Sequence, residues 1–435
     1  MEDLFGGLPE QGSGGCEVAG RPRLREAERR QVTLRIASLD DLLAAVHPAR
    51  LVWRFVEGLD LGALHAGIRS VAGHRGHPAA DPKILVSLWL YATLRGVGSA
   101  RELARLCRDH VAYQWLCGGV SMNHHTLSDF RTGHAQWLDA TLTASVAVLL
   151  HQGVVTLERV AQDGMRVRAS AGAASFRRGP SLHRCRQEAA AQVAALKAEL
   201  AADPAAGTRR RQAARQRAAA ERAARVEAAL AALPQVAAQR RRNGSKGEAR
   251  ASTTDPEARV MKMADGGFRP AYNVQFAADT GSQVVVGVAV SAHGSDQPAL
   301  EPMVGQIAAR YARLPGDYLV DGGFVALERI ERLSEQGVTL YAPPPTPRNG
   351  RDPAAALDTD SPAIAAWRAR MQTEAGQCVY RDRAATIECV NAQARNRGLT
   401  RLAVRGLTKV RAIALWHALA HNLARILSLP AAVTA

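Results

Sequence analysis

The spacing of apolar residues changes near residue 159, and this change constrains the fold more than any other feature of the chain. Before it, apolar residues recur at intervals of three and four positions, which is typical of amphipathic helices. After it, short apolar runs that end in aspartate or glycine alternate with further helical patterns, as strands do in α/β proteins. The sequence therefore predicts a helical region followed by a mixed α/β sheet.

Residues 39–153 are predicted to form a compact all-helical domain. Asp81, which a proline follows, is expected to cap one helix, because aspartate accepts hydrogen bonds from the first turn and proline fits there. Ser99 is expected to cap the next helix, which would end at Gly118. Two further helices are expected between residues 123 and 150.

The second part of the chain predicts strands and helices in the order β, β, β, α, β, α, β. Helices at residues 298–311 and 326–337 separate the last three strands. The third predicted strand, residues 282–292, is almost continuously apolar, which suits a buried strand. In the second, residues 271–279, apolar and polar residues alternate. The predicted strands cover residues 159–163, 271–279, 282–292, 317–321 and 338–344.

An alanine-rich segment, residues 183–242, follows the first of these strands. Its helical pattern is interrupted by Pro204 and Gly207, which are typical of a turn. The segment is therefore predicted to be a helical hairpin inserted into the α/β domain, which would extend over residues 154–430.

The formal net charge is +16, and it comes almost wholly from arginine, because the chain has only five lysines. An excess of this size favours a polyanionic partner, and arginine binds phosphate through two parallel hydrogen bonds. A GC-rich coding bias is an alternative source of a composition that is low in lysine and rich in alanine.

The six cysteines contain no C-x-x-C pair, so the sequence indicates neither a zinc site nor a disulfide framework. Residues 1–38 are rich in glycine, proline and charge without periodicity, which predicts a mobile segment. No apolar run reaches the roughly 18 residues that a membrane span needs. We therefore expect a cytoplasmic protein that does not contact membranes.

Two aspartates end predicted strands, and glycine follows each of them: Asp163 and Asp321. Active sites of open α/β sheets form outside the carboxyl ends of the strands, so these two side chains are predicted to converge. The alternative is that aspartate before glycine only makes a turn.

A third acidic residue, Glu388, lies on a helix predicted from about Ala384. Asn391 and Arg395 follow it at three- and seven-residue spacing, which places all three on one polar face. This face is either part of a site or simply solvated. The neighbouring apolar stripe comprises Ile387, Val390 and Ala394.

The segment "YRDRAATIECVNAQAR" resembles the Tyr, Arg, Glu, Lys signature of DDE transposases from bacterial insertion sequences. Tyr380, Arg383 and Glu388 are in place, and Arg395 stands where those families have lysine. "VAQDGMRVRASAG" is similar to their first-aspartate motif and "YLVDGGF" to their second. Other similar segments, including a helical stretch that resembles their N-terminal DNA-binding domain, cover residues 77–110, 255–262, 271–275, 294–300 and 405–427.

The resemblance implies a ribonuclease H-like catalytic core with an N-terminal all-α domain and an inserted α-helical hairpin. It also implies that two Mg²⁺ ions, with Mn²⁺ as a substitute, are held by Asp163, Asp321 and Glu388. Three carboxylates suit this role, because hard cations prefer oxygen ligands and two such ions activate both oxygens of a phosphoryl transfer. Tyr380, Arg383 and Arg395 would contact DNA.

The implied function is binding of terminal inverted repeats, strand cleavage and strand transfer into target DNA. The implied partner is double-stranded DNA, bound by a homodimer in the nucleoid. The hairpin would contact DNA or the second subunit, or it is a solvated coiled coil. Its arginines are Arg209, Arg210, Arg211, Arg215, Arg217 and Arg222.

The chain departs from the family's pattern at three positions: Met165 replaces a hydroxyl residue, Asn391 an aromatic residue and Arg395 a lysine. None of these changes removes a carboxylate. Two alternatives to a transposase remain, namely an inactive DNA-binding protein derived from one, or a nuclease that cuts without joining.

Overall fold

The structure is a computed structural model that describes residues 36–71, 73, 77–202, 208–242, 244, 247–345, 355 and 357–428. The chain divides into two compact units, Met1–Ser38 and Leu39–Ala435, and the elements described belong to the second. The predicted mobile segment 1–38 therefore lies almost entirely outside the described residues, as does the predicted turn at Pro204 and Gly207. None of the helices in the described ranges combines the length and the apolar character that crossing a membrane requires.

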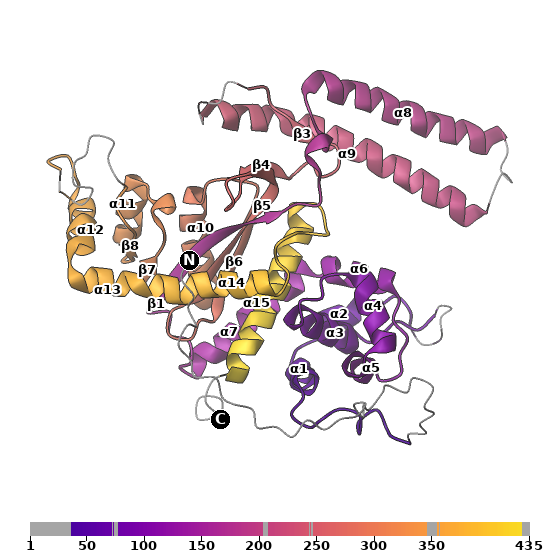
Figure 1. The fold of residues 1–435 in the computed structure, drawn as a ribbon, viewed down its shortest axis with the longest axis horizontal. Helices are drawn as coiled ribbons and strands as arrows, with labels where there is room; N and C mark the ends of the chain where they lie inside the picture. The colour runs from indigo at the N-terminus through magenta and orange to yellow at the C-terminus, as the bar shows by residue number, and fades with distance from the viewer. Residues whose placement is uncertain are drawn as a thin grey trace, which may run out of the picture. The chain divides into compact units, whose positions relative to one another are not determined.

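The first part of the second unit is helical, as the sequence predicts (Figure 1). The Asp81 side chain accepts a hydrogen bond from the Lys83 N–H at 2.8 Å, and the Ser99 hydroxyl accepts one from the Glu102 N–H at 3.3 Å, so both predicted caps are confirmed. The helices are α1 Pro48–Glu57, α2 Gly62–Ala66, α3 Pro82–Leu94, α4 Ala100–Asp109, α5 Val111–Cys117, α6 His124–Gly133 and α7 Ala135–His151.

The single helix predicted between Ser99 and Gly118 is wrong, because the chain breaks it at His110 into α4 and α5. The backbone of His110 is extended, and its Nδ1 atom accepts a hydrogen bond from the Ala112 N–H at 3.2 Å. The spacing of apolar residues is the same whether a histidine caps a new helix or lies on the surface of a continuous one. The break at His110 is therefore not visible in the periodicity.

The second part contains a mixed α/β sheet, which confirms the predicted fold class at that level. Its strand order is β4-β5-β1-β7-β8, and β6 also pairs with β5. Strand β1 is antiparallel to β5 and parallel to β7, which is parallel to β8. The strands are β1 Arg159–Arg168, β4 Arg259–Lys262, β5 Phe268–Asp279, β6 Val285–Ser291, β7 Asp317–Leu319 and β8 Thr339–Tyr341.

Two strand predictions need correction. Strand β1 does not end at Asp163 but continues to Arg168, because its antiparallel pairing with β5 persists after its parallel pairing with β7 has stopped. Strand β7 ends at Leu319, two residues before Asp321. The alternation seen in residues 271–279 also misleads, because every residue of β5 from Pro270 to Asp279 is buried.

The inserted hairpin is formed by α8 Gly179–Ala202 and α9 Arg209–Arg242, which lie side by side in Figure 1. Arg215 and Glu199 join the two helices through an ion pair of 2.7 Å. At the base of the hairpin, β2 Phe176–Arg177 pairs with β3 Ala251–Ser252. The remaining helices are α10 Leu300–Tyr311, α11 Leu327–Glu335, α12 Pro362–Gln372, α13 Glu374–Arg383, α14 Cys389–Asn396 and α15 Leu407–Ser428.

The helical region and the sheet share one hydrophobic core. Helix α15 packs against α3, α6 and α7 as well as against β6. Its Trp416 is fully buried and donates a hydrogen bond to the carbonyl of Arg131 at 3.0 Å. In α7, Asp139 forms ion pairs with Arg310 of α10 and with Arg411 of α15. Residue 153 therefore marks a change of secondary structure and not a break between two cores.

Candidate active site

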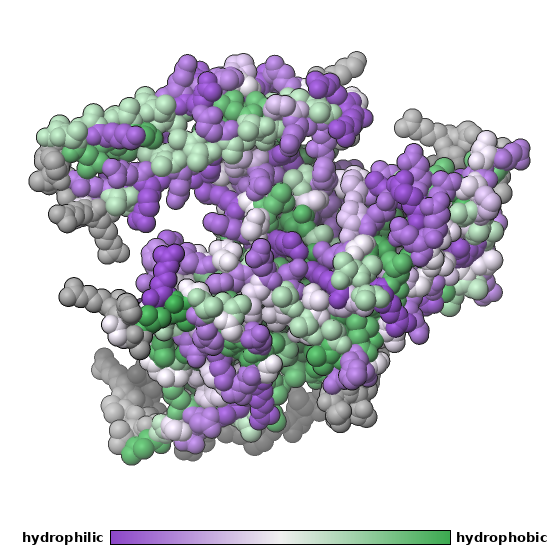
Figure 2. Space-filling view, turned by 180° about the vertical axis from the view of Figure 1, so that it is seen from behind, coloured by the Kyte–Doolittle hydropathy of each residue, from purple (hydrophilic) through white to green (hydrophobic). Residues whose placement is uncertain are grey.

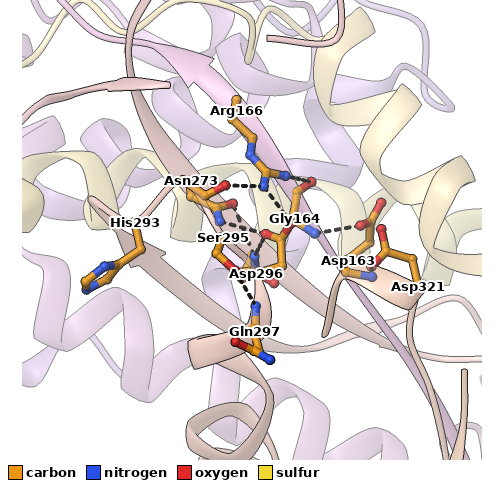
Figure 3. Close-up of polar contacts among 12 residues, drawn as sticks. Asp163, Gly164, Arg166, Asn273, His293, Ser295, Asp296, Gln297 and Asp321 are labelled. Atoms are coloured by element: carbon orange, nitrogen blue, oxygen red, sulfur yellow. Dashed lines mark hydrogen bonds and ion pairs between the residues drawn. The ribbon is translucent and has the colours of Figure 1, made fainter. Parts of the chain in front are cut away.

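Strands β1 and β7 place two carboxylates at the same level of the sheet. The last parallel pair of residues is Ala161 and Leu319. Asp163 follows Ala161 by two residues, and Asp321 follows Leu319 by two residues. Because parallel strands in register rise equally per residue, the two side chains arrive together at the edge of the pairing. Figure 3 shows them next to each other, and the charge of Asp321 acts on the titration of Asp163.

The carboxylate of Asp163 is held by hydrogen bonds on both oxygens. Oδ1 accepts from the Gly164 N–H at 2.8 Å, and Oδ2 accepts from the Asn391 amide at 3.1 Å. Burial, opposed by the Arg383 guanidinium and reinforced by Asp321, raises the pKa of Asp163 to about 6. Asp163 is thus a carboxylate whose negative charge is only partly compensated by the protein.

Glu388 lies at the end of a π-helical turn, Ala384–Glu388, that joins α13 to α14. Its Oε1 atom is 2.6 Å from Nη1 of Arg383, whose Nη2 atom is 3.9 Å from Oδ2 of Asp163. Arg383 therefore lies between the two acidic residues, with its side chain 10% exposed, whereas that of Glu388 is 55% exposed. Insertions of this kind in helices are frequent at functional sites because they redirect side chains.

The helix predicted from about Ala384 thus starts earlier than expected, at Glu374, and widens at the π-helical turn. The predicted apolar stripe is buried as expected. The predicted polar face is not uniformly solvated, because Asn391 is 1% exposed while Glu388 and Arg395 are exposed. The three side chains were expected on one face, but Asn391 turns into the protein and contacts Asp163.

Two of the residues predicted to contact DNA lie near these acids. Tyr380 is half-buried, and burial raises its pKa, while Arg383 opposes that rise. The charges of Asp321, Glu388 and Asp163 also contribute to the raised pKa of Tyr380. Arg395 is exposed and lines a neighbouring cavity with Gly164.

A buried acidic residue beside this site, Asp296, is not among the predicted site residues (Figure 3). Its Oδ1 atom accepts hydrogen bonds from the amides of Asn273 at 2.7 Å and Gln275 at 2.6 Å. Its Oδ2 atom is 2.7 Å from Nη2 of Arg166. Both oxygens are therefore occupied by the protein. The segments "AYNVQ" and "GSDQPAL" were the available signal, but only the fold brings them together.

Two family models match the chain. One, described as Transposase domain (DUF772), matches residues 37–133. The other, described as Transposase DDE domain, matches residues 356–427, which include the Glu388 segment. The two matches support a DDE transposase of an insertion sequence. No curated protein and no solved structure matches it.

DDE transposases generally use divalent metal ions, and the donors present fit such ions in part. Asp163 and Asp321 offer carboxylate oxygens in a site that lacks sufficient positive charge, and the buried Oδ1 atom of Asn391 has no hydrogen-bond partner. These are the ligands that Mg²⁺ prefers. Among the described residues, however, no three His, Cys, Asp or Glu side chains lie close enough together to hold a metal. Glu388 would have to leave Arg383 to complete the set.

The raised pKa of Asp163 predicts that the stability of the metal-free protein depends on pH. Below pH 4 the group is protonated in both the folded and the unfolded chain, whereas between pH 4 and 6 only the folded chain keeps the proton. The free energy of unfolding that depends on Asp163 should therefore fall as pH rises through this range, by roughly 2–3 kcal/mol.

Urea unfolding of wild type and Asp163→Asn at several pH values measures this effect as the difference between the two proteins. The subtraction removes the titration of the other carboxylates. A difference that stays constant from pH 4 to 7 would contradict the buried, poorly compensated carboxylate.

Proposed function

We propose that this transposase binds the terminal inverted repeats of its element, cuts DNA strands there and joins the freed ends to target DNA. The observation that carries the proposal is the meeting of Asp163 and Asp321 at one level of the sheet, with Glu388 separated from Asp163 only by Arg383. We further propose that residues 154–430 form a ribonuclease H-like catalytic domain and that a homodimer acts on the DNA.

In this proposal Asp163, Asp321 and Glu388 hold two Mg²⁺ ions, which supply an activated attacking oxygen and stabilise the leaving oxygen. The other residues of the site orient the carboxylates and compensate part of their negative charge. The Gly164 N–H and the Asn391 amide fix the direction of the Asp163 carboxylate. Arg383 supplies positive charge between Asp163 and Glu388, and its guanidinium suits a phosphate once Glu388 turns away.

A supercoiled plasmid that carries the DNA flanking both sides of the gene, where the proposal places the inverted repeats, tests it. Wild-type protein with Mg²⁺ should release strand ends at the repeats and produce joined strands. Cut ends without joined product would favour a nuclease. DNA binding without any cutting would favour an inactive derivative.

We also propose that the helical region, residues 39–153, binds duplex DNA. The side chains of Arg101 and Arg108 are exposed and lie two turns apart on α4. Desolvation, together with the charges of His125 and Arg101, lowers the pKa of His124, so the start of α6 adjoins this basic face. Asn123 caps α6, and neither His124 nor His125 is buried, so the two histidines serve neither as the cap of this helix nor as core residues.

Substituting Arg101→Gln and Arg108→Gln together should weaken DNA binding. Each lost phosphate contact is expected to reduce the slope of log K against log salt by about 1. The measurement is fluorescence anisotropy with the full-length protein, because α15 completes the core of the helical region. An unchanged slope for the double variant would remove α4 from the DNA interface.

A further inference from the structure

Beyond Asp163, strand β1 continues along a cavity of about 610 Å³ that the proposed chemistry does not use. The cavity begins at Gly164, the residue directly after Asp163. Its walls come from β1, from the turn between β4 and β5, from the loop after β6 and from α14. The positively charged residues that line it are Arg166, Arg168, Lys262, Arg269 and Arg395, and Asp265 is the only acidic residue among its lining residues.

Two of the five positive charges are already paired. Arg166 contacts Asp296 and donates to the carbonyl of Gly294 at 2.7 Å, and Arg269 contacts both oxygens of Asp265 at 2.7 and 2.6 Å. These contacts hold the two arginines in fixed positions on the wall. Asp265, the single acidic lining residue, is paired with Arg269 and therefore compensates none of the other three charges.

The other three positive charges are Arg168, Lys262 and Arg395. Their side chains are exposed, and within the described ranges none of them forms an ion pair or a side-chain hydrogen bond. Three uncompensated positive charges around one cavity repel each other and create a positive potential there. Such a cavity is suited to an anion that carries several charges in a row.

The geometry of β1 relates the cavity to the carboxylate site. Side chains alternate along a strand, so Arg166 and Arg168 project from the face opposite to Asp163, about 6.6 Å apart along the strand. Gly164, which lines the cavity, is the residue next to Asp163, so the cavity and the carboxylate site meet at this point of β1. The cavity thus adjoins the proposed cleavage site without contributing to its carboxylates.

We propose that this cavity binds the phosphodiester backbone of the DNA strand next to the bond that is cut. The inference rests on the proposed function and assigns it a new binding site, with Arg168 and Lys262 contacting phosphates and Arg166 held in place by Asp296. Arg395 lies on α14, the helix that directly follows Glu388.

The test uses full-length Arg168→Gln, Lys262→Gln and the double variant, which remove charges that stabilise no other residue. Binding to duplex DNA is measured between about 50 and 200 mM salt. Each single variant should reduce the slope of log K against log salt by about 1, and the double variant by about 2. The control is Arg313→Gln, which removes an exposed arginine from the segment that precedes β7, whereas Asp321 follows that strand. This variant should keep the wild-type slope.

A second measurement locates the contact. Single neutral methylphosphonates are placed along the strand beside the cut. Wild type should lose affinity at one or two positions, and the double variant should be insensitive at those same positions. Competition by inorganic phosphate beyond its ionic-strength effect would instead indicate a site for a free anion and overturn the backbone assignment.

The outcomes separate this inference from the proposed function. Unchanged slopes in both single variants, with wild-type nicking intact, would overturn the cavity site and leave the transposase reaction standing. A wild-type protein that neither binds nor nicks DNA would overturn both.

Discussion

Replacing Asp163, Asp321 or Glu388 with its amide is expected to lower the rate of Mg²⁺-dependent nicking by at least about 10³-fold. The amide keeps the shape of the side chain and removes the charge that a divalent ion needs. In the proposed mechanism the three residues act as a unit, so the double variants should be scarcely slower than the single ones. The measurement is conversion of supercoiled plasmid to the nicked form, with DNA affinity measured in parallel.

Glu388→Gln is the most informative of these variants, because Glu388 contacts Arg383 and lies outside any group of three metal-binding side chains in the described residues. If Glu388 were only a solvated residue, its amide would nick DNA at nearly the wild-type rate. The control is Glu158→Gln, which changes an exposed glutamate directly before β1, at the other end of the strand pairing. Nicking by Glu388→Gln at the rate of this control would exclude Glu388 from the active site.

Gly164→Ala is expected to lower the free energy of unfolding by about 3 kcal/mol and to abolish nicking. A Cβ atom at Gly164 would lie 2.1 Å from Nε2 of Gln275 and 2.2 Å from Oδ1 of Asp296. These atoms are the ends of side chains, but the residues are buried and hydrogen-bonded to each other, so neither can move away without losing a bond. If the backbone at residue 164 shifted instead, it would displace the N–H that orients Asp163.

Gly305→Ala provides the matched control, because Gly305 is exposed within α10 and a Cβ atom there meets nothing within 4 Å. Alanine in a helix is favoured over glycine by about 1 kcal/mol, so this variant should be slightly more stable than wild type. Urea unfolding of the three proteins measures the effect. A wild-type midpoint for Gly164→Ala would show that the Asp296 network tolerates the added atom.

The sequence by itself determined the features that depend on neighbouring residues. The caps at Asp81 and Ser99 involve donors two and three residues away, and the nearly continuous apolar runs of α3 and of the first half of β6 coincide with buried residues. The three acidic residues could be picked out because their local motifs resemble those of a family. The matches at residues 37–133 and 356–427 support that family, and the second of them includes one of the three residues, Glu388.

Only the tertiary structure decided how the site is built. Asn391 reaches Asp163 across 228 residues of sequence, and Asp296, in the loop after β6, joins Arg166 of β1 to Asn273 and Gln275 of β5. The end of β1 likewise depended on its pairing partner, since β5 continues alongside it after β7 has stopped. Periodicity records which side of an element is buried, but not which polar group it meets there. A buried polar group must have a hydrogen-bond partner, because an unpaired polar group inside a protein is costly. Which partner it has is set by the register of strands that are far apart in the chain.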